Sequence, residues 1–234
     1  MLFSGTSLSD LSRTAIILII AGFISVGSAF FIFLELAEDV MEKEKFAVDR
    51  IAIDLMNAIS SDPLSIIVGW ITEAGAVPII TVASIVLAIY LLFFSSFSAW
   101  VTVYFGINMI GISLLTKGLK LMFERQRPDT LAQYDGTGFS FPSGHTTGAA
   151  TFYGFLIYLT VISPLDRKWK WPINILLATV ILLVALSRVY LGVHFFTDII
   201  AGLMLGLSWL FICIGALELT IWRQRRRQGN RQVR

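Results

Sequence analysis

The chain has 234 residues, of which 56% are hydrophobic and 15% are charged, and its formal net charge is +2. A water-soluble domain of this length could not bury so much apolar surface, so the composition excludes a soluble protein and predicts an integral membrane protein. The net charge excludes no partner, because the charges are unevenly distributed along the chain. The single cysteine, Cys213, excludes an internal disulfide.

Charge-poor apolar runs follow one another along the chain and predict transmembrane helices. Each run is long enough to cross a hydrocarbon layer of roughly 30 Å as a helix that rises about 1.5 Å per residue. The connections are short, so we predict an all-α bundle of six transmembrane helices in one domain, residues 1–234, without a soluble domain or a linker. The runs cover residues 14–34, 76–94, 97–119, 146–163, 171–191 and 195–222.

The first run contains Gly27-Ser28-Ala29, which could serve as a signal-peptidase site. Apolar residues continue through Leu36, and the only preceding basic residue is Arg13. A retained membrane anchor is therefore favoured over a cleaved leader.

The segment between the first two runs, residues 40–60, mixes apolar and charged residues. This pattern predicts an amphipathic helix on the outer membrane surface, which could guide lipid along that surface. Its apolar members are Val40, Phe46, Ile51, Ile53, Leu55 and Ile59.

The distribution of charge predicts the orientation of the bundle in the membrane. The basic tail, residues 223–234, resists translocation and should stay in the cytoplasm. Nucleic-acid or anionic-lipid contact is the alternative use of this tail, but a topology anchor is favoured. Counting back through six helices places the basic connection 166–170 and the amino terminus inside as well. The acid-rich segment 35–62 then lies outside, which agrees with the rule that cytoplasmic loops carry the basic residues.

In this topology three polar segments reach the outer side, although none was used to assign it. The first carries Lys120 and Arg127 before the helix-stopping Pro128. The two cations lie about two helical turns apart, so they would project from one stripe if the helix continues to about Gln126. As an isolated pair they could instead be interface anchors that snorkel to the headgroups.

The second segment is Pro142-Ser143-Gly144-His145, at the predicted start of the fourth transmembrane helix. Proline suits a first helical turn, Ser143 is a natural cap, and the free backbone N–H groups of a helix start attract anions. Such a start is common by itself, but here His145 brings an imidazole to the same anion site.

The third segment joins the fifth and sixth predicted helices and carries Arg188, His194 and Asp198. A guanidinium such as that of Arg188 can bind two phosphate oxygens in parallel. His194 and Asp198 are four residues apart, so in a helix the carboxylate could accept a proton from one ring nitrogen and leave the other unprotonated and nucleophilic. A helix cap or a structural ion pair is the alternative role for Asp198. Histidines beside fixed cations favour phosphate chemistry.

Taken together, the three segments of residues 120–198 resemble the three-part signature of the type 2 phosphatidic acid phosphatase (PAP2) superfamily, with all signature positions present. The size and helix layout are similar to bacterial phosphatidylglycerophosphatase B-type enzymes. The resemblance implies that His194 attacks phosphorus to form a phosphohistidine, that Asp198 holds its ring, and that His145 protonates the departing oxygen. The implied phosphoryl-binding residues are Lys120, Arg127, Ser143, Gly144 and Arg188.

The resemblance implies a metal-independent lipid phosphate phosphatase of the plasma membrane, with cytoplasmic termini, an outward-facing site, no cofactor and no nucleic-acid partner. Phosphatidylglycerol phosphate and undecaprenyl diphosphate are the favoured substrates, with phosphatidic acid a further one. It also implies that Glu73 lies near the site as a headgroup contact, for which an interfacial charge is the alternative. Residues 129–141 could form a lid, and the oligomeric state is left open.

Two rival functions belong to other classes. A lipid carrier or flippase would bind the phosphate without hydrolysing it. A haem protein could use both histidines as axial ligands, but it leaves Lys120, Arg127, Arg188 and Asp198 unexplained.

Overall fold

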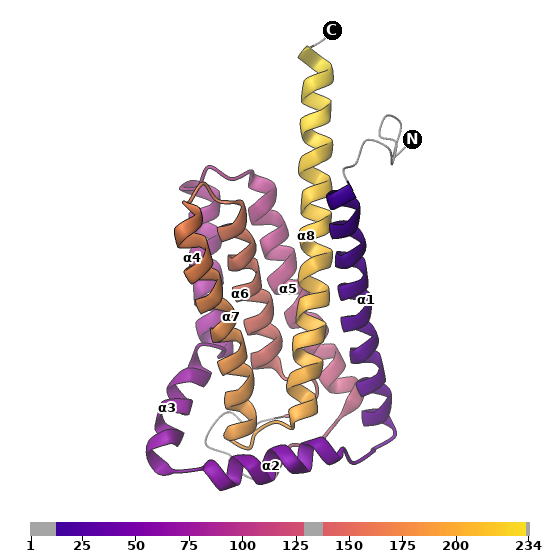
Figure 1. Cartoon of the computed structure of the whole chain (residues 1–234), viewed down its shortest axis with the longest axis vertical. Coiled ribbons are helices and arrows are strands. Elements are labelled where there is room, and N and C mark those ends of the chain that lie inside the picture. The colour runs from indigo at the N-terminus through magenta and orange to yellow at the C-terminus, as the bar shows by residue number, and fades with distance from the viewer. Residues whose placement is uncertain (1–12, 129–137, 233–234) are drawn as a thin grey trace.

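The computed structural model describes residues 13–128 and 138–232, and every regular element in these ranges is a helix. The predicted all-α class is therefore confirmed. The long helices α1 and α4 to α8 run beside one another, and α2 lies across one end of the bundle (Figure 1). The helices are α1 (Arg13–Met41), α2 (Ala47–Ile59), α3 (Asp62–Glu73), α4 (Val77–Phe93), α5 (Ala99–Phe123), α6 (Gly144–Ile162), α7 (Arg167–Tyr190) and α8 (Phe196–Gln232).

Four stretches of the described chain are long and apolar enough to cross a membrane. They identify a multi-pass membrane protein, but they do not include α1 or α6, so the six-span arrangement stays a prediction. α6 differs from the others because the first half of this helix is polar and packed inside the protein, with His145, Thr146, Thr147 and Thr151 all buried. The four stretches are Asp62–Phe93, Ala99–Phe123, Arg167–Tyr190 and Phe196–Arg227.

The end of α5 departs from the expectation that Lys120 and Arg127 share one helical stripe. α5 ends at Phe123, and Glu124 adopts a left-handed backbone conformation with φ of +47°. Arg127 therefore lies in the non-helical segment that leads to Pro128, where helical geometry is disfavoured. Any approach of Lys120 to Arg127 must come from the turn after α5 and not from helical spacing.

The amphipathic helix predicted for residues 40–60 is observed as α2, but it begins only at Ala47. Val40 belongs instead to the last turn of α1, where it is buried against the bundle. The turn at Lys43, with φ of +59°, separates the two helices. α2 therefore covers the end of the bundle where α5 and α7 end and α6 and α8 begin (Figure 1).

Two glycines of α8 allow this helix to approach α6 closely. A Cβ atom on Gly202 would lie 2.9 Å from the Ser143 carbonyl oxygen, and one on Gly206 would lie 3.0 Å from the Thr147 carbonyl oxygen. Small residues at helix contacts are typical of membrane bundles. This contact fixes the start of α6 against the start of α8, where two of the three polar segments lie.

Candidate active site

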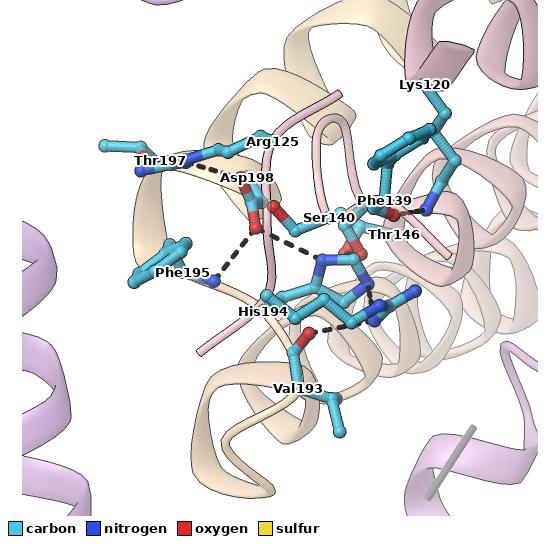
Figure 2. A network of polar contacts seen from close by, with 12 residues as sticks. Lys120, Arg125, Phe139, Ser140, Thr146, Val193, His194, Phe195, Thr197 and Asp198 are labelled. Atoms are coloured by element: carbon cyan, nitrogen blue, oxygen red, sulfur yellow. Dashed lines mark hydrogen bonds and ion pairs between the residues drawn. The ribbon is translucent and has the colours of Figure 1, made fainter. Parts of the chain in front are cut away.

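The three polar segments meet at the end of the bundle covered by α2. They are the end of α5 with the residues after it, the start of α6, and the connection between α7 and α8 (Figures 1 and 2). Elements far apart in the chain thus bring the predicted residues together.

His194 and Asp198 form the buried centre of this arrangement, with 1% and 0% of their surfaces exposed. His194 Nδ1 lies 3.2 Å from Asp198 Oδ2, across the four-residue spacing identified in the sequence. The same carboxylate oxygen accepts a hydrogen bond from the Phe195 backbone N–H at 2.9 Å. Asp198 therefore both caps the start of α8 and contacts the His194 ring, and its role in orienting a nucleophile stays a prediction.

The protonation of His194 follows from its surroundings. Burial lowers the pKa of His194 to about 4; the Asp198 carboxylate opposes this shift, and the Arg127 and Lys120 cations add to it. The imidazole is therefore neutral at pH 7. With its one proton on Nδ1, facing Asp198, the lone pair belongs to Nε2.

Arg127 stands at the Nε2 side of His194. Its Nη1 lies 3.2 Å from His194 Nε2 and donates to the Val193 carbonyl oxygen at 2.8 Å, while Nε donates to the Gly138 carbonyl oxygen at 2.9 Å. The guanidinium thus reaches His194 from the turn after α5.

Lys120 approaches from the last turn of α5, and its Nζ donates to the Phe139 carbonyl oxygen at 2.6 Å (Figure 2). A Cβ atom on Gly144 would lie 3.8 Å from Lys120 Cε, so the lysine passes beside the start of α6. Lys120 and Arg127 hence both reach the site, although α5 ends between them.

The start of α6 places Ser143 and Gly144 as the sequence predicted, with one difference. Ser143 occupies the N-cap position, but its hydroxyl accepts a hydrogen bond from Thr146 Oγ1 at 3.1 Å and makes no capping bond to the backbone. The Ser143 backbone N–H donates to the Asp198 carbonyl oxygen at 3.1 Å. This bond joins the α6 and α8 starts directly.

His145 and Arg188 complete the predicted set, and both are buried. Burial lowers the pKa of His145 to about 3, and the neighbouring Arg188, Lys120 and Arg127 cations add to this shift. Arg188 Nη1 donates to Thr72 Oγ1 of α3 at 2.8 Å. All eight predicted site residues thus lie at one end of the bundle; their roles in catalysis stay predictions.

Sequence reasoning missed three polar residues that hold this site. Arg125 donates to the carboxylates of Asp198 and Asp49, and Asp49 comes from α2. Thr72 of α3 accepts from Arg188. Arg125 stood inside the first polar segment, but Asp49 is one of many acids before α3, and no sequence signal separates it from the others.

Other predictions concern the surroundings of the site. Glu73 is exposed on α3, and its role as a headgroup contact is untested. Residues 129–137 of the predicted lid lie outside the described residues. Within residues 13–128 and 138–232, no group of three or more His, Cys, Asp or Glu side chains could hold a metal ion. The expectation of a metal-independent reaction remains a prediction.

Comparison with known proteins assigns the family. The model of the PAP2 superfamily matches residues 100–222, and this range contains all eight predicted site residues. The chain belongs to the PAP2 superfamily. The matched range of this PAP2 protein begins in α5, so Asp49 and Thr72 lie outside it.

Two curated relatives are similar to this PAP2 protein over its carboxyl-terminal part. Phosphatidylglycerophosphatase B of Bacillus subtilis is 44% identical over 103 residues, which cover 44% of this chain and 51% of that protein. Undecaprenyl-diphosphatase of Sulfolobus acidocaldarius is 39% identical over 102 residues, or 42% of this chain and 43% of that protein. The match thus spans about half the length of each relative.

A solved structure resembles the fold over a longer range. The crystal structure of a transmembrane PAP2 type phosphatidylglycerolphosphate phosphatase from Bacillus subtilis matches with a TM-score of 0.74 and 31% sequence identity. The match covers 83% of this chain and 96% of that one. The helical arrangement is therefore that of a transmembrane PAP2 protein.

Proposed function

We propose that this PAP2 protein is a lipid phosphate phosphatase that removes a terminal phosphate through a phosphohistidine on His194. The observation that carries the proposal is the His194–Asp198 pair, in which a buried, neutral imidazole has Nδ1 at 3.2 Å from the carboxylate and Nε2 beside a cation. A neutral ring nitrogen held in one orientation is a competent nucleophile. The two curated relatives, which are named as phosphatases of lipid phosphates, support the phosphatase activity.

The first step uses both histidines. The Nε2 lone pair of His194 attacks phosphorus and forms a P–N bond, while the bond from phosphorus to the lipid oxygen breaks. For this step His145 must carry a proton, a form that the negative charge of the bound phosphate favours. It transfers this proton to the lipid oxygen, so the product leaves as a neutral alcohol, or as the lipid monophosphate when the substrate is a diphosphate. The Nδ1–H bond to Asp198 stabilises the ring as it becomes phosphorylated.

The second step restores the enzyme. His145, now neutral, accepts a proton from water, and the water oxygen attacks phosphorus as the P–N bond breaks. Inorganic phosphate leaves, and His194 Nε2 recovers its lone pair. The same imidazole thus serves as acid and then as base, which returns every proton to its starting place.

Cations around His194 stabilise the charge of the transferred group. Lys120, Arg127 and Arg188 would bind the equatorial oxygens together with the Ser143 hydroxyl and the Gly144 backbone N–H. Arg127 already lies at Nε2, where a phosphoryl group would be a stronger acceptor than the imidazole. Losing one such donor typically costs about 3 to 4 kcal/mol of transition-state stabilisation.

The proposal extends to topology and substrate. Six spans with cytoplasmic termini place the site at the outer face, and the basic residues 167–170 and 223–227 at the opposite end support this orientation. Phosphatidylglycerol phosphate and undecaprenyl diphosphate remain the favoured substrates, because relatives are named for activity on each.

Phosphate release by detergent-purified protein tests the function. The native chain should release inorganic phosphate from at least one of phosphatidylglycerol phosphate, undecaprenyl diphosphate and phosphatidic acid with EDTA present. His194→Ala should release none, whereas Lys168→Gln, an exposed residue far from the site, should match the native chain. Release by His194→Ala at the native rate would contradict the proposal.

A further inference from the structure

α2 lies outside the family-matched range, yet one of its side chains reaches the site. Asp49 points from α2 into the bundle and is 5% exposed. Its Oδ1 accepts from the Thr197 backbone N–H at 2.8 Å, and its Oδ2 accepts from Thr197 Oγ1 at 2.8 Å. Thr197 stands in the first turn of α8, where backbone N–H groups have no partner within the helix. Asp49 therefore caps α8 from a different helix.

Arg125 connects this cap to the histidine. Its Nη2 donates to Asp49 Oδ2 at 2.8 Å, and its Nη1 donates to Asp198 Oδ1 and, at 2.8 Å, to Thr197 Oγ1. The guanidinium also lies over the Phe195 and Phe46 rings, at 4.2 Å and 5.4 Å from their centroids. These contacts on several sides fix the position of the guanidinium.

Arg125 and His194 use different oxygens of the Asp198 carboxylate. Oδ2 faces His194 Nδ1, whereas Oδ1 is held by Arg125 (Figure 2). A carboxylate bound through both oxygens cannot rotate away from the ring, and the adjacent guanidinium favours its ionised form. The orientation and proton position of His194 therefore depend on Arg125, and the position of Arg125 depends on Asp49.

The surface of α2 shows where Asp49 is anchored. Asp49, Ala52 and Met56 face the bundle, and the last two pack beside residues of α7 and α8. A second face exposes apolar side chains, and a third exposes Arg50, Asp54 and Asn57. A helix with one apolar and one polar exposed face is suited to the membrane interface. The exposed apolar residues are Val48, Ile51, Leu55 and Ile59.

We infer that Asp49 and Arg125 are positioning residues for the reaction, which hold Asp198 so that His194 keeps its proton on Nδ1 and its lone pair on Nε2. The inference rests on the proposed function, because it assigns what orients the proposed nucleophile. The inference also requires α2 to stay docked on the bundle at the membrane interface, because Asp49 holds Arg125 only from that position. Neither residue touches the phosphoryl group, so both act through Asp198.

The two histidines of the chain allow a test that does not depend on turnover. In protein labelled with ¹⁵N-histidine and carrying His145→Gln, the remaining imidazole is His194, and its ¹⁵N chemical shifts report which ring nitrogen carries the proton. With Asp49 and Arg125 intact, the proton should lie on Nδ1. Asp49→Asn and Arg125→Gln should each move proton population to Nε2, whereas Arg50→Gln and Asp54→Asn, on the exposed polar face of α2, should not.

Kinetics of the same substitutions, made in the chain with His145 intact, supply the second readout. Loss of the outer partner of a metal-bound histidine typically costs about 10 to 100-fold. We expect a fall of similar size in kcat here, with KM nearly unchanged. Arg125→Lys keeps the charge but cannot contact Asp198 and Asp49 through two separate nitrogens, so it should recover part of the rate. It also provides a folded variant if Arg125→Gln unfolds.

The results of these experiments separate the positioning role of Asp49 and Arg125 from the proposed phosphatase function. Native tautomer populations and native kcat in both Asp49→Asn and Arg125→Gln would overturn the inference and leave the proposed function intact. A tautomer shift in these variants, with no phosphate release by the native chain from any lipid, would keep the positioning role and reject the phosphatase function.

Discussion

The two ends of the bundle use charge in opposite ways. At the end covered by α2, Asp49, Arg188 and Asp198 are at least 95% buried, and each contacts other polar groups of the site. At the opposite end, the ion pair between Lys168 and Asp166 leaves the two side chains 72% and 73% exposed. Burying a charge is costly unless it is paired. The buried network therefore carries a desolvation cost, which the proposed function explains. The exposed pair carries no such cost and needs no explanation.

Among substitutions at the site end, Asp198→Asn should have the largest effect on kcat. The amide keeps the shape of the carboxylate but can present its NH₂ group to His194, which favours the wrong ring tautomer. We expect kcat to fall by about 10⁴-fold, the loss seen when the acid of a Ser-His-Asp triad is replaced by its amide. Phosphate release at saturating lipid measures the effect, and a loss smaller than about tenfold would contradict the orienting role.

A backbone contact at the site end offers a test of packing. In Gly202→Ala the new Cβ would stand 2.9 Å from the Ser143 carbonyl oxygen, so α8 and the start of α6 must separate. Overpacking of this kind costs about 1 to 3 kcal/mol of folding free energy, and kcat should fall because Ser143 moves. Thermal unfolding in detergent measures the loss of folding free energy.

The matched control for that substitution is Gly215→Ala, farther along α8, where a Cβ would meet no atom within 4 Å. This variant should keep the native unfolding temperature and rate. Equal losses in the two variants would show that α8 tolerates no added methyl group anywhere, so the close contact at Ser143 would not be special.

The pH dependence of kcat/KM tests how the charges at the site end affect His194. Because the pKa of His194 is lowered to about 4, the ring stays neutral and nucleophilic until the pH falls towards that value. The acid limb of kcat/KM should therefore lie near pH 4. Arg127→Gln removes a cation that lowers this pKa, so the pKa should rise and the acid limb should move to higher pH.

The profile of kcat/KM against pH in the native chain and in Arg127→Gln checks this expectation, whatever the absolute rate of the variant. Arg167→Gln, at the start of α7 and distant from the site, provides a charge-matched control with an unmoved limb. An acid limb that stays in place in Arg127→Gln would assign the titration to another group.

The smallest effect should come from the exposed end. Lys168→Gln breaks the exposed ion pair with Asp166, and such pairs contribute about 0 to 1 kcal/mol. Neither the unfolding temperature nor kcat should change measurably. A loss comparable to that of Gly202→Ala would remove the contrast between the two ends.

The sequence predicted most of the fold because each signal was local. Apolar runs located α1 and α4 to α8, although α1 continues to Met41 and α8 to Gln232, and no run predicted α3. The spacing of His194 and Asp198 predicted their contact. The end of α5 was missed because the left-handed turn at Glu124 is set by tertiary contacts of the two arginines that follow. Asp49 was missed because its burial depends on how α2 docks, which no spacing in the chain encodes.

The most direct test of the account is to trap the covalent intermediate. Protein mixed briefly with ³²P-labelled lipid phosphate is quenched in alkali, in which phosphohistidine survives, and the labelled peptide is identified. We predict label on His194 in the native chain and none in His194→Ala. Phosphate release by the native chain without label on His194, or label that persists in His194→Ala, would contradict the central claim that His194 is the nucleophile.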